Sequence, residues 1–371
     1  MSSRGAEQGQ DRPELREAMA ELVGAGFLGV QLRVNDGRGE WVGGAGVREA
    51  GRDGGVVTDG HFRIGSSTKS FVATTVLSLV AEGRFGLDAT VDDLLPGYGL
   101  DRRITVRMLL QHTTGIFNHT GELYEDGTIV LGVPWQGKEW VDNRFRTYPP
   151  EELVRLSLSR PARFAPGAGW SYANTNYVLA RMVVEEVTGR PFAEELRRLV
   201  LEPLGLTGTV APGASPELPE PHNHGYYRYQ DAGRERTIDV TRQNPSWVGA
   251  GGDMISTTRD LHRYFSALMG GRLLPADLLA ELRTPEPTAG YGLGVFAQET
   301  AGGTVFHHHG ATMGSAALMY GSPDGRTTLT AGLTWVDDAA MSIAPAFQAA
   351  QQRFVDAVFR GEAARRGEPA R

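Results

Sequence analysis

The strand-type and helix-type hydrophobic patterns of this chain occupy different parts of the sequence, and their order limits how the chain can fold. Residues 27–34 and 40–47 alternate apolar and polar side chains around an Asn-Asp-Gly-Arg-Gly turn, which predicts a β-hairpin. From about residue 66 to 284 the apolar residues recur at intervals of three and four, which is typical of helices. Four expected strands then follow, within residues 291–298, 303–310, 315–325 and 326–335, and a Ser-Pro-Asp-Gly-Arg turn joins the last two.

This order predicts one antiparallel sheet that is built from both ends of the chain and flanked by helices, with an all-α subdomain inserted in the middle. The fold class is therefore α/β (α+β). We expect a discontinuous α/β subdomain, residues 1–65 with 285–371, and a helical subdomain, residues 66–284. Amphipathic helices near residues 13–24 and 341–359 complete the expected α/β part.

Composition excludes several classes of function. The 371 residues carry a formal net charge of -7, so the protein offers no basic field for nucleic acid or for an anionic membrane surface. The chain has no cysteine, which removes disulfides, thiolate nucleophiles and cysteine zinc sites. Its first residues are polar where a secretory signal needs an apolar stretch, and no run reaches transmembrane length. We therefore expect a cytoplasmic protein without an obligate protein partner.

Lys69 is one of only two lysines in a chain that otherwise uses arginine, and it follows Ser66 by three residues at the start of a strongly apolar helix. Side chains three apart share a helix face, so Ser66 and Lys69 form a candidate pair. Partial desolvation lowers the pKa of a lysine and lets its neutral amine accept a serine proton, which a guanidinium cannot do. Taken alone, this spacing more often marks a capped helix start whose lysine extends its amine to solvent. The interpretation as a catalytic pair therefore depends on partner residues elsewhere in the chain.

Two later stretches supply such partners. Residues 172–174, Tyr-Ala-Asn, lie on a loop just before an expected helix, and their side chains can pass a proton and hold a substrate carbonyl. Residues 308–310, His-His-Gly, end a strand of β-branched and aromatic residues. Each stretch also has a structural interpretation, as an Asn-rich helix cap in the first case and as a polar edge strand in the second.

Together with Ser66 and Lys69, these stretches match in order and spacing the three motifs of serine acyl-enzymes. The match extends through FRIGSSTKSFVATTVLSLVAEGRFGLDATVDDLLP, ITVRMLLQHTTGI, WSYANTNYVLA and YGLGV. The chain thus resembles the serine β-lactamase-like superfamily over roughly residues 25–355, especially its D-alanyl-D-alanine carboxypeptidase and class C β-lactamase branch. The resemblance implies the serine β-lactamase/D,D-peptidase fold, an active site at the interface of the two subdomains, and no cofactor.

By similarity to this family, Ser66 is the nucleophile that forms the acyl-enzyme, Lys69 is its general base, and Tyr172 relays the proton to the leaving atom. Asn174 would hold the acyl-side amide of the substrate. The backbone amides of Ser66 and Ala311 would form the oxyanion hole.

His308 and Gly310 complete the site that the resemblance implies, whereas we expect His112 to be structural. His308 replaces the lysine of many relatives and would orient Tyr172, and Gly310 is the glycine of the third motif. His112 also matches a family segment, but its place at a helix end favours a capping role.

The residues that hold the free carboxylate of the substrate in carboxypeptidases differ in this chain. The corresponding positions are His309 and Phe296, and a phenylalanine cannot bind a carboxylate. We therefore predict a serine hydrolase that acts through acyl-Ser66 on a small-molecule or peptide-like ester or amide. The open alternatives are a D-alanyl-D-alanine carboxypeptidase or β-lactamase, a penicillin-binding-protein-type thioesterase that cyclises a nonribosomal peptide, and a catalytically inactive binding relative.

Other chemistries have little support in the sequence. No serine has the two flanking glycines of an α/β-hydrolase elbow, and Glu139 stands where a P-loop needs serine or threonine. His307 and His309 would share one face of a strand, but no nearby carboxylate completes a metal site. We therefore expect no metal.

Overall fold

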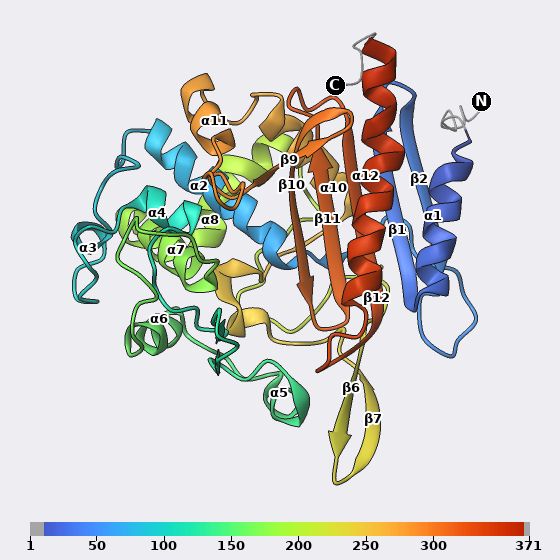
Figure 1. Cartoon of the computed structure of the whole chain (residues 1–371), viewed down its shortest axis with the longest axis horizontal. Helices are drawn as coiled ribbons and strands as arrows, with labels where there is room; N and C mark the ends of the chain where they lie inside the picture. The colour runs from blue at the N-terminus through green and yellow to red at the C-terminus, as the bar shows by residue number, and fades with distance from the viewer. Residues whose placement is uncertain (1–10, 367–371) are drawn as a thin grey trace.

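The computed structural model describes residues 11–366, and the side chains of residues 11–359. At its centre is an antiparallel sheet with the strand order β2-β1-β12-β11-β10-β9 (Figure 1). The N-terminal strand β1 pairs with the C-terminal strand β12, with Val30 opposite Leu333, so both chain ends build one sheet as predicted. The strands are β1 (Phe27–Asp36), β2 (Gly39–Gly46), β9 (Phe296–Thr300), β10 (Gly303–Thr312), β11 (Ser315–Gly321) and β12 (Thr328–Asp338).

The two faces of the sheet belong to two separate hydrophobic cores, and the side chains of β11 are divided between them. Its side chains alternate in direction, so Leu318 and Tyr320 join the core under α1 (Pro13–Gly24) and α12 (Ala344–Arg366), whereas Met319 joins the core on the other side. Figure 1 shows α1 and α12 together on one face of the sheet. Residues 1–10 and 367–371, which we expected to belong to this part, lie outside the described residues.

Most of the regular secondary structure in the inserted region, residues 66–284, is helical. Residues 192–204 form two short α-helices joined by a π-helical stretch, Arg197–Leu201. No helix of the described residues is long and apolar enough to cross a membrane. The helices of the region are α2 (Thr68–Ala81), α3 (Val91–Leu94), α4 (Val106–Gln111), α5 (Gly137–Asn143), α6 (Pro150–Leu158), α7 (Asn174–Thr188), α8 (Phe192–Leu196), α9 (Glu202–Leu204), α10 (Thr258–Met269) and α11 (Ala276–Arg283).

The structure corrects the expectation of an all-α insertion in one detail, because short strands also occur there. A hairpin of β6 and β7 projects from the molecule, and β6 runs parallel to β12 at the end of the main sheet (Figure 1). The side chains of β7 are largely exposed, so this hairpin lacks the apolar alternation that marks a buried strand. The short strands are β3 (Phe62–Arg63) with β8 (Ile255–Ser256), β4 (Glu122–Leu123) with β5 (Ile129–Val130), and β6 (Tyr226–Asp231) with β7 (Arg234–Asp239).

The strand expected over residues 291–298 begins only at Phe296. Gly294 has a φ of +85°, and a side chain there would collide with Ala73 of α2. The preceding residues therefore turn against α2 before the chain enters β9. Gly294 of the YGLG segment therefore allows a close approach to α2, which directly follows the turn that carries Ser66.

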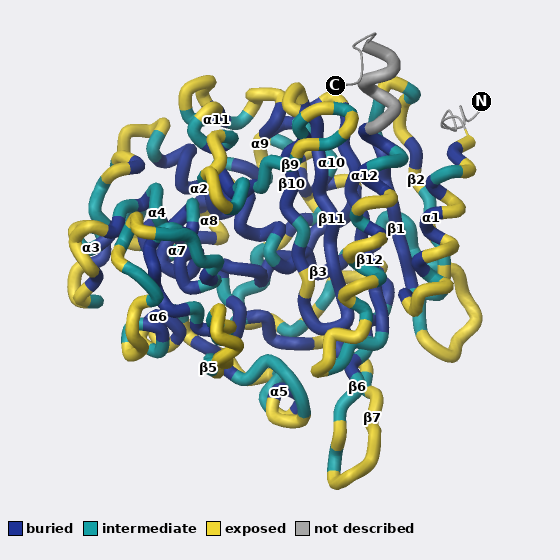
Figure 2. The backbone as a smooth tube through the Cα atoms, viewed as in Figure 1, coloured by how far each residue is buried: buried dark blue, intermediate teal, exposed yellow. Residues whose placement is uncertain are grey.

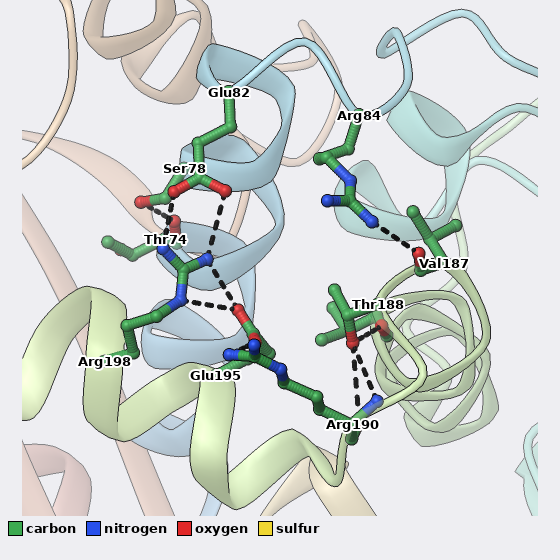
Figure 3. A network of polar contacts seen from close by, with 10 residues as sticks. Thr74, Ser78, Glu82, Arg84, Val187, Thr188, Arg190, Glu195 and Arg198 are labelled. Carbon is green, nitrogen blue, oxygen red and sulfur yellow. Dashed lines mark hydrogen bonds and ion pairs between the residues drawn. The ribbon is translucent and has the colours of Figure 1, made fainter.

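An ion-pair network ties the far end of α2 to the helical segment that begins at α8. The Arg198 guanidinium contacts both carboxylate oxygens of Glu82, at 2.6 and 3.0 Å, and also reaches Glu195 Oε2 at 2.7 Å (Figure 3). Glu195 is buried and the other two side chains are partly exposed. The Arg198–Glu82 pair is open to solvent, and exposed pairs are worth about 0.2–1 kcal/mol. The network therefore orients α2, whose stability comes from its apolar packing.

Candidate active site

Ser66 and Lys69 lie at the start of α2, as the sequence predicts. Ser66 is in a 3-10 turn, Gly65–Ser67, and Lys69 follows in the first turn of the helix. The Lys69 Nζ lies 3.2 Å from the Ser66 Oγ. Ser66 is half-buried, whereas Lys69 is fully buried. A substrate can therefore reach the hydroxyl while the amine stays shielded from water.

The surroundings of Lys69 favour a neutral amine. Burial lowers the pKa of Lys69 well below that of a free lysine, and the charge of Asp253 opposes this shift. A neutral amine has two N–H groups and one lone pair. Two oxygens are in place to accept the N–H groups, Asn174 Oδ1 at 2.7 Å and the Gly251 carbonyl at 2.6 Å. The lone pair is then left for Ser66 Oγ, which is the arrangement that a general base requires.

Tyr172 and Asn174 lie against this pair at the start of α7. The Tyr172 hydroxyl is hydrogen-bonded to the Ser66 side chain, and the Lys69 Nζ lies 4.5 Å from the centre of the tyrosine ring. Burial raises the pKa of Tyr172 above its ordinary value, so the phenol stays protonated at neutral pH. Asn174 Nδ2 donates to Thr120 Oγ1 at 3.1 Å, which turns Oδ1 toward Lys69. The structure thus brings the first two motifs together.

Strand β10 passes close to the turn that carries Ser66. A side chain at Gly310 would collide with the Ser66 amide, and one at Gly65 would lie 2.6 Å from the Ala311 nitrogen. Glycine at both positions allows the two backbones to approach each other. Ser66 is also in the first turn of its helix, where a backbone amide lacks an intrahelical partner. The Ala311 nitrogen therefore lies beside the turn that carries Ser66, and the oxyanion hole formed by the two amides stays a prediction.

His308 contacts the site differently from our expectation. Its Nδ1 donates to the His309 carbonyl at 2.8 Å, so its Nε2 accepts a hydrogen bond from the Tyr291 hydroxyl at 3.2 Å. Burial lowers the pKa of His308 well below its ordinary value, which keeps the ring neutral. We expected His308 to orient Tyr172, but the hydrogen bonds of His308 within residues 11–359 do not include that hydroxyl. The Tyr291 ring lies 6.4 Å from the Tyr172 ring, so Tyr291 connects the two.

His112 is closer to the site than a helix-capping role implies. It does end α4, with a left-handed φ of 64°. Its buried ring nevertheless lies 4.4 Å from the Tyr172 ring, and its Nδ1 accepts from the Ala173 N–H at 3.3 Å and from Asn176 Nδ2 at 3.2 Å. His112 therefore holds the loop that carries Tyr172. In the sequence, the signal for this role was the match of the segment around His112 to the family. That match does not show that the end of α4 meets the loop before α7.

The positions that correspond to a carboxylate clamp form an aromatic stack. The rings of Phe296 and His309 lie 6.3 Å apart with planes 9° apart, and His307 stacks on both. The His309 ring also contacts Phe347 of α12. Burial lowers the pKa of His309, so neither residue supplies a permanent positive charge. Within the described part of the chain, no group of three or more His, Asp or Glu residues could hold a metal ion.

Comparison with known proteins agrees with this geometry. The family model described as Beta-lactamase matches residues 15–350. The chain belongs to the Beta-lactamase family. Within the Beta-lactamase family, the chain is 36% identical to a D-stereospecific amidohydrolase from Streptomyces sp., with a TM-score of 0.80 and coverage of 95% of this chain and 99% of that chain.

Two further proteins similar to this chain are named as an amidase and an esterase. A D-amino acid amidase from Ochrobactrum anthropi SV3, solved in complex with D-phenylalanine, is 25% identical, with a TM-score of 0.77 and coverage of 93% of this chain and 98% of that chain. Esterase EstB from Burkholderia gladioli is 37% identical over 180 residues, which is 46% of this chain and 43% of the esterase. The alignments span 43% to 60% of the length of the first curated relatives.

Proposed function

We propose that this member of the Beta-lactamase family is a serine hydrolase that forms an acyl-Ser66 intermediate on an ester or amide substrate. The observation that carries the proposal is the 3.2 Å contact between the Ser66 Oγ and the Nζ of the buried Lys69. The names of the Streptomyces amidohydrolase and the Burkholderia esterase support both substrate types.

In this mechanism Lys69 takes the Ser66 proton as Oγ attacks the substrate carbonyl carbon. The negative charge that develops on the carbonyl oxygen is stabilised by the amides of Ser66 and Ala311. The tetrahedral intermediate then breaks its C–O or C–N bond, and Tyr172 passes the proton received by Lys69 to the leaving atom. Water next attacks the acyl-enzyme with Lys69 as base, which releases the acid and restores Ser66.

The surroundings favour a leaving group without a carboxylate. Phe296 and His309 offer an aromatic ring and a neutral imidazole where a clamp would need a cation. We therefore propose that the substrate is a small-molecule or peptide-like ester or amide. A D-alanyl-D-alanine terminus or a β-lactam fits this site less well. The cytoplasmic location and the lack of an obligate protein partner stay predictions of the sequence.

Intact-protein mass spectrometry tests the nucleophile and the leaving group together. The protein and its Ser66→Ala variant are mixed briefly with an acyl-D-Ala-D-Ala free acid, with its methyl ester, and with 4-nitrophenyl acetate as a small activated ester. We expect adducts from the two esters only, and none in the variant. An adduct from the free acid would restore the carboxypeptidase interpretation. No adduct from any probe, or an equal adduct in Ser66→Ala, would contradict the acyl-Ser66 proposal and favour an inactive binding relative.

A further inference from the structure

The most exposed large apolar side chains of the described residues gather in one place. Leu131, Ile129 and Leu123 are 77%, 68% and 66% exposed, and Met341 is 52% exposed. The first three belong to or directly follow β4 and β5, and Figure 2 shows the exposed backbone at β5. All four line a single cavity. Such a concentration of exposed apolar side chains marks a binding surface, whereas single exposed apolar residues are ordinary.

The cavity has the size and chemistry of a site for a neutral apolar group. Its volume is about 730 Å³, within the usual range for small-molecule sites. Trp135 and Val133 add to its apolar lining. Its ionisable lining residues, among those that the structure describes, are Glu122 and Glu139, and Glu122 is paired with Arg163. A carboxylate would therefore be repelled, whereas an alkyl or aryl group would lose contact with water at little cost.

This cavity adjoins the candidate active site through Asn174. Two lining residues hold that asparagine: Asn118 Oδ1 accepts its backbone N–H at 3.0 Å, and Thr120 Oγ1 accepts from its Nδ2 at 3.1 Å. Asn174 in turn contacts Lys69, the partner of Ser66. Asn118 and Thr120 thus connect the cavity to the asparagine that contacts the base beside Ser66.

We propose that this cavity binds the acyl portion of the substrate, and that the substrate carries a bulky, neutral, apolar acyl group of the alkyl or arylalkyl class. The inference rests on the proposed function, because it assigns the group that is attached to the carbonyl of acyl-Ser66. The leaving group occupies the opposite side of that carbonyl, so its chemistry is separate from that of the cavity.

A series of 4-nitrophenyl esters tests the acyl group alone, because all members share one leaving group. For the wild-type protein we expect kcat/KM to rise at least about tenfold from the acetate to the octanoate, since each methylene gained in an apolar pocket favours the transition state. We also expect the hexanoate to be preferred over the adipate monoester, which has the same length but ends in a carboxylate. Spontaneous hydrolysis is subtracted in each case.

A double variant, Ile129→Ser with Leu131→Ser, locates the preference. Both side chains are exposed, so the change removes apolar lining without opening a core. We expect the octanoate-to-acetate ratio of kcat/KM to fall toward one. Val42→Ser is the matched control, because Val42 is an exposed apolar residue on β2 outside the cavity. The control is expected to keep the wild-type ratio, and thermal unfolding verifies that each variant is folded.

The outcomes separate this inference from the proposed function. Ser66-dependent turnover of the acetate with no preference for longer chains would overturn the cavity assignment alone. The same conclusion follows if the adipate monoester is preferred, or if the double variant keeps the wild-type ratio. Turnover of the acetate that does not depend on Ser66 would overturn the proposed function instead.

Discussion

The Lys69 amine is surrounded by three oxygen atoms, those of Ser66, Asn174 and Gly251. We expect Lys69→Arg to reduce acylation by about 10²–10⁴-fold, because the guanidinium keeps its proton and cannot act as a base. The measurement is the rate of adduct formation with 4-nitrophenyl acetate, followed by intact mass. Lys138→Arg is the matched control, since Lys138 is the only other lysine and pairs with Asp142 on the surface. Near-normal acylation by Lys69→Arg would remove the role assigned to Lys69.

Asp253 affects the pH range in which Lys69 is neutral. Burial raises the pKa of Asp253 to about 6, although Arg181 lies 3.5 Å away and favours the charged form. When charged, Asp253 raises the pKa of Lys69. We therefore expect Asp253→Asn to shift the acid limb of the kcat/KM–pH profile to lower pH. An unchanged or upward-shifted limb would show that the carboxylate does not act on Lys69.

The same carboxyl group makes stability depend on pH with a defined sign. The pKa of Asp253 is about 6 in the folded protein and 3.8 for a free aspartate, so between pH 4 and 6 the folded state binds more protons than the unfolded state. The free energy of unfolding therefore falls as the pH rises through about 4 to 6. Relative to wild type, Asp253→Asn should gain stability over this interval, by at most about 3 kcal/mol. Urea unfolding at pH 4 and pH 7 measures the difference, and a gain that shrinks with rising pH would contradict the sign.

Among the elements of the fold, the contact of β10 with the turn before α2 is the one on which the oxyanion hole depends. Gly310→Ala would push the strand away from the Ser66 amide, because the new methyl group has no room there. We expect acylation to fall by roughly 10²–10³-fold, the typical loss when one oxyanion donor is removed. Gly24→Ala is the control, since a methyl group at the end of α1 meets nothing. Unchanged acylation in a folded Gly310→Ala protein would argue against this oxyanion hole.

At the scale of the whole molecule, the core under α12 is separated by the sheet from the core that supports the active site. Phe354 of α12 is completely buried in the first of these cores. We expect Phe354→Ala to lower the free energy of unfolding by about 3–5 kcal/mol while kcat/KM of the folded protein at low temperature stays unchanged. Urea unfolding and ester turnover measure the two quantities, with the exposed Gln352→Ala as control. A parallel loss of activity in folded protein would show that the two cores are coupled.

The local patterns of the sequence were sufficient for the order of the main-sheet strands and for the pairing of Ser66 with Lys69, but they missed the short strands of the inserted region. The apolar run over residues 315–321 predicted β11, because a strand whose side chains point alternately to two buried faces is apolar along its length. The three-residue spacing of Ser66 and Lys69 predicted their contact, because the geometry of one helix turn fixes it. In both cases the pattern lies within one short, continuous stretch of the chain.

Only the tertiary structure decided which distant segments complete the site. His112 meets the loop before α7, and Tyr291 joins His308 to Tyr172, although neither contact leaves a periodic signal in the chain. The apolar cavity likewise combines the β4–β5 hairpin, and Leu131 directly after it, with Met341, which lies more than two hundred residues later. Hydrophobic periodicity reports which face of an element is buried, and it carries no information on which other element covers that face. That choice depends on how the elements pack together in three dimensions.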